Sequence, residues 1–227
     1  MKITKLENYS DENGNRIKYD GEKIDCDIVF LDKTAHNNIL SIHKDAKIRK
    51  LKVEFLCNNA TIYIGKCSDG KFIMQAGEDC IITVGDKVSC TGNTYIFTAE
   101  GTTISIGNDV MFASGVYIKS HDHHPIFDIK SGKRVNKSKN IIIEDHVWLA
   151  DQVYVGKSSI IKSGSMIGFR SFVSGYIPNN CLAVGTPAKV IKKDIAWERP
   201  LLNWIEPFYK PDATCLKKSD YWNLTEE

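Results

Sequence analysis

A six-residue period of aliphatic side chains constrains the fold of this chain more than any other feature. The series reads Ile143, Leu149, Val155, Ile161, Ile167 and Val173. Small or β-branched residues stand four positions after most of these, at Val147, Val153, Ser159, Ser165 and Ser171. No face of a helix has such a period, whereas short strands that turn a corner at each repeat do, with one inward aliphatic and one small residue per corner. The period therefore predicts stacked short strands.

A second repeat indicates the length of one coil. A phrase like Ile-x-Ile-Gly, with Val84 in place of the second isoleucine in one copy, ends at Gly65, Gly85 and Gly107, so these glycines are 20 and then 22 residues apart. Three hexapeptides and a small bulge account for that length. This is typical of a parallel β-helix, in which each coil adds three short strands and about 4.8 Å of height. A β-sandwich is the alternative, but it would show period-two alternation and hairpin turns. We therefore predict an all-β chain.

The N-terminal residues differ from the repeat that follows them. Residues 1–23 contain the turn signals Asn13-Gly14 and Asp20-Gly21, which predict a hairpin or a cap. Some cap is needed, because an uncovered β-helix end would expose unpaired backbone groups. Residues 24–191 are predicted to form the β-helix itself.

The C-terminal residues change in composition toward aromatic residues and proline. For residues 192–227 we predict a short helix from Ile195 to Ile205, broken by Pro200, and an aromatic tail. The tail is expected to pack on the β-helix or on a neighbouring subunit, although its rings could instead stack on a sugar. The chain as a whole is expected to be one structural domain.

One long segment interrupts the repeat. Residues 119–140 lie between aliphatic positions Ile118 and Ile141, and they are too polar and too numerous for a coil corner. The segment contains three of the six histidines of the chain. Long loops on a rigid scaffold are disproportionately functional, so we predict an extruded functional loop.

Composition excludes several classes of partner. Among 227 residues the formal net charge is only +2, too even for a protein that recognises nucleic acid or an anionic membrane by bulk charge. No apolar run is long enough to span a bilayer, and the first ten residues lack the apolar core of a secretion signal, so we expect a cytoplasmic protein. The seven cysteines are widely spaced without a CxxC pair, and we expect them to be reduced and mostly core fillers.

Four motifs add to the repeat. They read Ser120-His-Asp-His-His-Pro-Ile126, Gly132-Lys-Arg-Val-Asn136, Val147-Trp-Leu149 and Gly185-Thr-Pro-Ala-Lys-Val-Ile-Lys192. In combination they resemble the hexapeptide-repeat acyltransferases, which are left-handed β-helix enzymes that move an acetyl group from acetyl-CoA. Within that family the chain is most similar to bacterial capsular polysaccharide O-acetyltransferases of the sialic-acid capsule type. The resemblance covers roughly residues 60–200.

The resemblance implies a catalytic histidine before the proline, at His124. A sugar hydroxyl is a weak nucleophile, and a base with a pKa near neutrality must take its proton as it attacks the thioester. His121 and His123 are rivals for this role. Asp122 could orient the imidazole, as the carboxylate of a triad does, or it could only form an Asx turn. Trp148 is the second implied catalytic residue; its indole should point outward and donate a hydrogen bond near the thioester, unless it is a subunit-interface aromatic.

The same resemblance implies a coenzyme A site. Lysines 189 and 192 match the basic positions that meet the nucleotide phosphates, where lysine acts as a point charge. The residues implied along the pantetheine arm are Ala150, Gly168, Arg170 and Ser174. Ala150 replaces the glycine usual in the family, and Asp151 puts an anion where neutral residues often face the cofactor.

These residues lead to one predicted function. We expect a homotrimeric, acetyl-CoA-dependent O-acetyltransferase that needs no metal and acts on a cell-surface polysaccharide or its precursor. The predicted acceptor-binding residues are His121, Lys133 and Arg134, and the cationic loop indicates an acidic glycan, although ordinary solvation explains its charge equally well. The alternatives are a small-sugar or xenobiotic acetyltransferase, a non-catalytic glycan-binding protein, and a zinc enzyme resembling γ-carbonic anhydrases.

Overall fold

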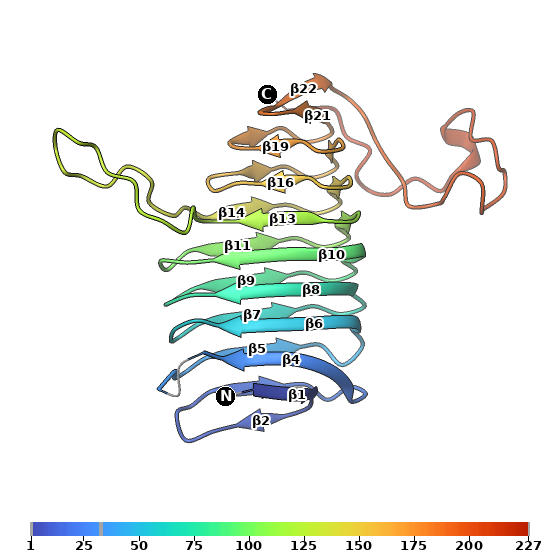
Figure 1. Cartoon of the computed structure of the whole chain (residues 1–227). Coiled ribbons are helices and arrows are strands. Elements are labelled where there is room, and N and C mark those ends of the chain that lie inside the picture. Colours follow the sequence, from blue (N-terminus) through green and yellow to red (C-terminus); the bar gives the residue numbers. More distant parts are fainter. Residues whose placement is uncertain (1, 32–33, 227) are drawn as a thin grey trace.

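The aliphatic period folds as a parallel β-solenoid whose coils stack along one axis (Figure 1). The computed structural model describes residues 2–31 and 34–226. The predicted left-handed parallel β-helix is confirmed. Among the described residues, no helix has the length and apolar character that crossing a bilayer requires.

Two sheets make up the solenoid. The first contains β2 (Tyr9–Ser10), β3 (Arg16–Lys18), β5 (Ile39–Ile42), β7 (Thr61–Ile64), β9 (Ile81–Val84), β11 (Thr103–Ile106), β14 (Ile141–Ile143), β17 (Ile160–Ile161) and β20 (Tyr176–Ile177). The main path of the second contains β1 (Lys2–Leu6), β4 (Ile24–Phe30), β6 (Lys47–Phe55), β8 (Asp69–Ala76), β10 (Ser89–Thr98), β12 (Met111–Phe112), β15 (Trp148–Leu149), β18 (Met166–Ile167), β21 (Leu182–Gly185) and β22 (Ala188–Lys192). Off this path lie β13 (Val116–Lys119), β16 (Tyr154–Val155) and β19 (Phe172–Val173).

The coils change shape along the axis. Strand β10 pairs with both β12 and β13, so one long strand is followed by two short ones and the cross-section becomes three-sided. The bulge predicted from the glycine spacing is also present. Between Ser89 and Asn93 the register shifts against Asp69 and Lys71, which accommodates the two extra residues of that coil.

The predicted inward residues form the core. All six members of the aliphatic series are buried, and so are the small residues beside them. The hydroxyl of Ser159 donates to the carbonyl oxygen of Gly156 at 2.7 Å, so this polar group remains satisfied inside the stack. Cysteine burial was only partly predicted. Cys80, Cys90 and Cys181 are buried, whereas Cys67 is exposed, and all seven thiols are free.

The N-terminal strands close one end of the solenoid. Strand β1 runs antiparallel to β4, and β2 and β3 form an antiparallel hairpin before β3 joins β5 in parallel. The turn of this hairpin contains Gly14 at φ 79°, a conformation that glycine adopts without steric cost.

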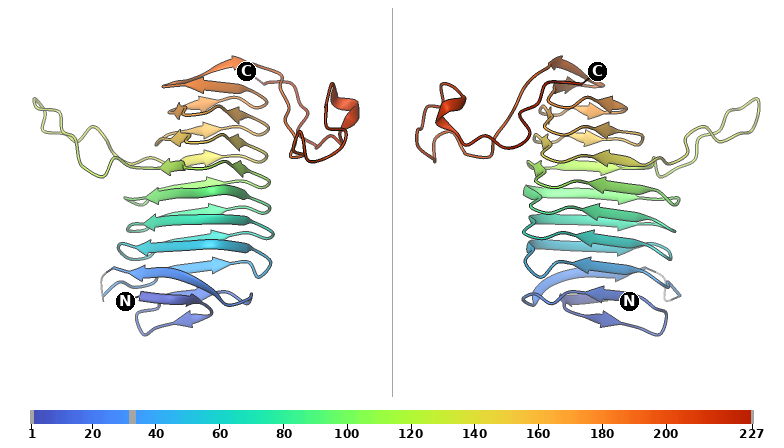
Figure 2. Two further views of the ribbon diagram at one scale, coloured as in Figure 1. Left: turned by 45° about the vertical axis from the view of Figure 1, so that its right-hand side comes forward. Right: turned by 180° about the vertical axis from the view of Figure 1, so that it is seen from behind.

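The short helix predicted from Ile195 to Ile205 is not formed. The only helical turn of the described tail is a 3-10 turn, η1, at Ala213–Cys215. Pro200 has no backbone N–H, and the carbonyl oxygen of Trp197 binds a side chain of the solenoid in place of a helical donor. The tail therefore follows the solenoid wall to residue 199 and then projects from it (Figures 1 and 2).

The predicted loop leaves the corner between β13 and β14, on the edge opposite the tail (Figure 2). A buried amide holds its base. The Oδ1 of Asn136 accepts from the backbone N–H of Ile126 at 2.7 Å, and its Nδ2 donates to the carbonyl oxygen of His124 at 2.8 Å. One side chain thus joins the two limbs of the loop.

A carboxylate of the preceding coil provides the second anchor. The carboxylate of Glu100 forms an ion pair with Arg134 and accepts a hydrogen bond from the backbone N–H of Ser138 at 3.1 Å. These hydrogen bonds, led by that from Arg134, lower the pKa of Glu100 to about 2. The charge of Glu100 therefore helps to fix the loop to the solenoid.

Replacing the inward Ile161 by alanine should lower the free energy of unfolding by about 2 to 5 kcal/mol, because it leaves a cavity in a close-packed column. The matched control is Ile142→Ala, since this side chain points outward from β14 and is 40% exposed. The control should lose no more than about 1 kcal/mol in denaturant unfolding. Equal losses would contradict the assignment of inward and outward positions.

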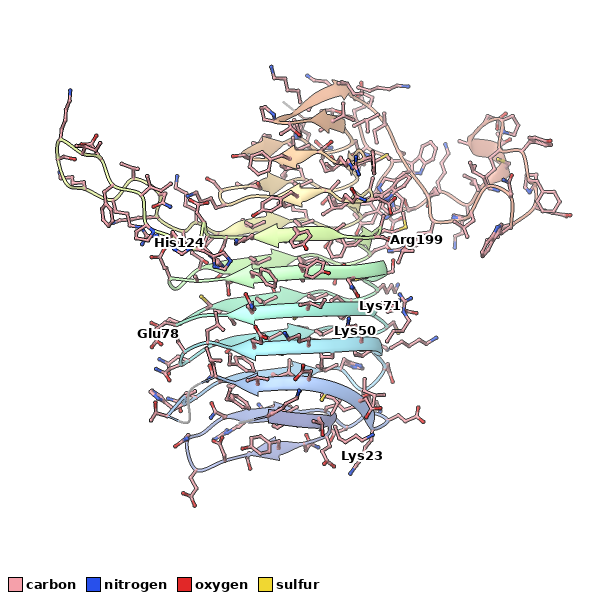
Figure 3. All side chains as sticks on the ribbon, in the orientation of Figure 1. Lys23, Lys50, Lys71, Glu78, His124 and Arg199 are labelled. Carbon is pink, nitrogen blue, oxygen red and sulfur yellow. The ribbon has the colours of Figure 1, made fainter. Side chains whose placement is uncertain are left out.

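Acid should release the loop before it unfolds the solenoid. The pKa of Glu100 is about 2 in the folded chain and ordinarily 4.5. Its contribution to stability is therefore complete above pH 4.5 and is lost as the pH falls from there toward about 2. Hydrogen-exchange protection of the loop amides should follow this course, and Glu100→Gln should reduce it already at pH 7. Glu78 occupies the same edge one coil earlier (Figure 3), so Glu78→Gln is the control and should leave the loop protected.

Candidate active site

A cavity of about 290 Å³ lies where the loop leaves the solenoid. The end of β13, the base of the loop and the outward side of β16 and β19 form its walls. The lining residues are Lys119, His121, Asp122, Tyr154, Gly156, Lys157, Phe172 and Ser174. Aromatic rings beside cations and an imidazole suit a polar ligand that carries negative charge.

His121 lies buried in this wall, and its ring accepts a hydrogen bond. Its Nδ1 faces the backbone N–H of His123 at 3.1 Å and therefore accepts. Burial, with smaller contributions from His123 and Lys119, lowers the pKa of His121 to about 4, so the ring is neutral near pH 7. A neutral ring that accepts at Nδ1 carries its proton on Nε2. His121 can therefore donate a hydrogen bond from Nε2 but cannot take a proton there.

Asp122 is held by partners other than an imidazole. Its carboxylate accepts from Nδ2 of Asn136 at 2.9 Å and forms an ion pair with Lys157. The hydrogen bond from Lys157 outweighs burial and lowers the pKa of Asp122. The carbonyl oxygen of Asp122 accepts from the backbone N–H of His124 at 2.8 Å. The carboxyl group thus fixes the shape of the histidine segment.

The other two loop histidines are exposed. His123 has φ 66°, and this left-handed turn carries the chain outward from the buried His121 to the exposed His124. The ring centroids of His123 and His124 are 6.5 Å apart. Figure 3 shows His124 at the base of the loop, beside the solenoid edge. Its imidazole is free to meet a substrate from solvent or from a neighbouring chain.

The predicted cofactor residues fall into three places. Ala150 and Gly168 lie one above the other at the corner after β15 and β18, and the exposed Arg170 follows them. Ser174 lines the cavity with His121. Lys189 and Lys192 lie exposed on β22, in the antiparallel hairpin that ends the solenoid.

Trp148 lies on the opposite edge of the chain from His124. Its ring is half-buried on the outward side of β15 and contacts Trp197 of the tail, with ring centroids 5.8 Å apart. The loop and the tail leave opposite edges in every view (Figures 1 and 2). A single chain therefore does not bring these two predicted catalytic residues together.

The two predicted acceptor-binding cations also differ in place. Lys133 is exposed near the tip of the loop, whereas the guanidinium of Arg134 is taken by Glu100. Among the described residues, no group of three or more histidines, cysteines or carboxylates is arranged to hold a metal ion.

Sequence reasoning missed two parts of this site. The first is Lys157, which lines the cavity as the partner of Asp122. The second is an outward column of rings on β10, β13, β16 and β19 that ends in the cavity, formed by Tyr95, Tyr117, Tyr154 and Phe172. Neighbouring ring centroids in this column are 4.2, 6.2 and 5.6 Å apart. Its signal was present, because Tyr95 and Tyr117 are 22 residues apart, the length of one coil.

Comparisons with known proteins agree with this fold. No family model matches the chain. A polysialic acid O-acetyltransferase of Neisseria meningitidis is 32% identical over 169 residues, which are 74% of this chain and 78% of that protein. A polysialic acid O-acetyltransferase of Escherichia coli O1:K1 / APEC is 35% identical over 126 residues, 53% of this chain, and the match spans only 41% of that protein.

Two crystal structures match over most of the solenoid. The polySia-specific acetyltransferase NeuO has a TM-score of 0.72 at 31% identity and covers 86% of this chain and 95% of its own. The polysialic acid O-acetyltransferase OatWY has a TM-score of 0.69 at 28% identity and covers 79% of this chain and 90% of its own. The chain therefore belongs to the family of hexapeptide-repeat, left-handed β-helix O-acetyltransferases.

Proposed function

We propose that this chain transfers an acetyl group from acetyl-CoA to a hydroxyl of an acidic capsular polysaccharide or of its precursor. The observation that carries the proposal is an exposed imidazole, His124, two residues along the loop from Asp122 of the cavity wall, in the fold of relatives named polysialic acid O-acetyltransferases. Because acetyl-CoA is the proposed donor, we assign the reaction to the cytoplasm.

His124 serves as the general base in this proposal. Its imidazole takes the proton of the acceptor hydroxyl while the oxygen attacks the thioester carbonyl carbon. The new C–O bond forms, the C–S bond breaks, and the proton passes from His124 to the leaving thiolate. His121 is the weaker rival, because its ring already accepts at Nδ1 and is protonated at Nε2. It is better suited to donate a hydrogen bond to the acceptor sugar.

The acyl donor is proposed to lie along the corner marked by Ala150 and Gly168. Both residues present little side chain at this corner, where Val184 packs against Gly168, so an extended pantetheine arm would lie over the backbone there. Lys189 and Lys192 at the end of the solenoid supply point charges for its phosphates. Arg170 flanks the path at this corner, whereas Ser174 would meet the donor from the cavity at the base of the loop. Trp148 would donate its indole N–H near the thioester oxygen, which becomes negative as the hydroxyl attacks.

A complete site in this proposal needs two chains. His124 and Trp148 lie on opposite edges of one solenoid, so they can meet only when the loop of one copy faces the tail edge of the next. Such a contact joins different surfaces of identical chains and generates a closed ring when the rotation from one copy to the next closes. We propose the homotrimer as that ring.

The acceptor is proposed to be anionic because cations surround the histidines. Lys119 lines the cavity, where Lys157 is already paired with Asp122, and the exposed loop contributes Lys130, Lys133 and Lys137. Arg134 has no part in this recognition, since Glu100 neutralises it.

His124→Asn should lower kcat by about 10² to 10⁴-fold, because transfer then lacks its base. The KM for acetyl-CoA should change little. His123→Asn removes a neighbouring exposed ring and is the matched control, which should keep most of the turnover. Steady-state kinetics with a capsular oligosaccharide measure kcat and KM for the unmodified chain and for both variants. Near-normal turnover of His124→Asn, with loss in His121→Gln or His123→Asn, would show that another histidine is the base.

Acetyl transfer to an acidic glycan should fall as salt rises, because salt screens exposed charges beyond a Debye length of about 8 to 10 Å. A neutral glycan of similar length should react more slowly at low salt and show no such dependence. The triple variant with Lys130, Lys133 and Lys137 changed to Gln should weaken the preference for the acidic glycan. Equal rates for both glycans at every salt concentration would leave the cationic loop without a role in recognition.

A further inference from the structure

A buried histidine outside the loop helps to bind the C-terminal tail to the solenoid. It acts beside Asn180, whose Nδ2 donates to the carbonyl oxygens of Ile195 and Tyr221 at 3.0 and 2.6 Å. His146 lies at the corner between β14 and β15, and its side chain is only 2% exposed. Its Nδ1 lies 2.6 Å from Oδ2 of Asp109, and its Nε2 lies 3.1 Å from the carbonyl oxygen of Trp197. Both ring nitrogens therefore face groups that accept hydrogen bonds.

The charge of the ring follows from these partners. A carbonyl oxygen has no proton to donate, so Nε2 must carry one. Asp109 is an acceptor as well: burial opposes its ionisation, but hydrogen bonds from His146 and Arg199 outweigh burial and lower its pKa. Nδ1 must then also carry a proton. Only the imidazolium satisfies both contacts, because a neutral ring has one N–H and would leave a buried acceptor against a lone pair.

Two aromatic rings enclose this cation. The Trp197 ring stacks on the imidazole of His146, with 4.1 Å between ring centroids and 10° between ring planes. The Tyr221 ring also stacks on it, with 4.5 Å between centroids and 2° between planes. Stacking of a cation on aromatic faces is favourable and strengthens when water is excluded. Trp197 also donates from its indole Nε1 to the carbonyl oxygen of His146 at 3.1 Å. Both limbs of the tail thus meet at one ring.

Arg199 extends the same network to earlier coils (Figure 3). Its Nε donates to Oδ1 of Asp109 at 2.6 Å, and its Nη1 donates to the hydroxyl of Ser89 at 2.8 Å. We call Asp109, His146, Trp197 and Arg199 the tail anchor. Because Trp197 is buried against Trp148, the tail anchor determines what covers the outward side of β15.

We propose that His146 is a positioning residue of the acetyl-transfer site: as an imidazolium it holds residues 195–199 against Trp148 and so fixes the orientation of that indole. The inference rests on the proposed function of Trp148. Its structural part, a doubly protonated His146 that retains the tail, stands on the contacts of the tail anchor alone.

The charge of His146 can be measured directly. In the full chain labelled with ¹⁵N-histidine, both nitrogens of His146 should show the shifts of protonated, donating nitrogens under the conditions of the transfer assay. The resonances are assigned by their loss in His146→Gln, and Asp109→Asn should remove the second proton without changing the volume of the site. One unprotonated ring nitrogen in the unmodified chain would overturn the proposal.

Kinetics and proteolysis test the positioning role. His146→Gln and Asp109→Asn should speed trypsin cleavage within residues 192–218. Both variants should also lower kcat by about tenfold to a hundredfold, the loss expected for a misplaced group. The KM for the acceptor should stay within about twofold of its normal value. His43→Gln changes a partly exposed corner histidine far from the tail and should alter neither readout. Unchanged cleavage or unchanged kcat in both anchor variants would refute the role. If the unmodified chain transfers no acetyl group, the proposed function fails, but cleavage and the spectrum still decide the structural part.

Discussion

The structure depends on parallel backbone pairing between successive coils, whose strands direct aliphatic side chains inward. Pairing in parallel register places each residue directly above its equivalent in the coil below, as Trp148 lies between Met111 and Met166. Inward positions become the core, and outward positions become columns that run along the axis. The ring column that ends at the cavity and the small-residue corner of Ala150 and Gly168 are both consequences of this stacking.

A scaffold of this kind tolerates an insertion only at a corner, where it interrupts no ladder. The histidine loop leaves one such corner, and it would be a mobile excursion without its anchors, because a long polar loop buries little apolar surface. The buried amide of Asn136 joins its two limbs, and Glu100 binds it to the preceding coil. His124 consequently stands on a fixed base although its ring is exposed.

The tail solves a similar problem on the opposite edge. The described residues beyond β22 join no strand, so side chains and a single backbone bond from Ile195 to Asn180 hold the tail. The enclosed ring of His146 does so with partners from both limbs of the tail. The two edges of the chain thus present complementary halves of the proposed site, one with the base and the other with Trp148.

The sequence by itself determined the solenoid, the position of the loop and the coil length, because a period of six and a spacing of about 20 residues leave few alternatives for a chain that must bury its aliphatic residues. It also singled out the histidine segment, since polar residues that break such a period must leave the stack. Tertiary structure alone decided the roles within that segment: burial and the N–H of His123 make His121 a donor, and Glu100 takes Arg134. It also decided the tail, where the local pattern favoured a helix from Ile195 to Ile205. Bonds from Trp197 to His146 and from Arg199 to Ser89 override that preference, and they join residues 51 and 110 positions apart, a separation that no local pattern can encode.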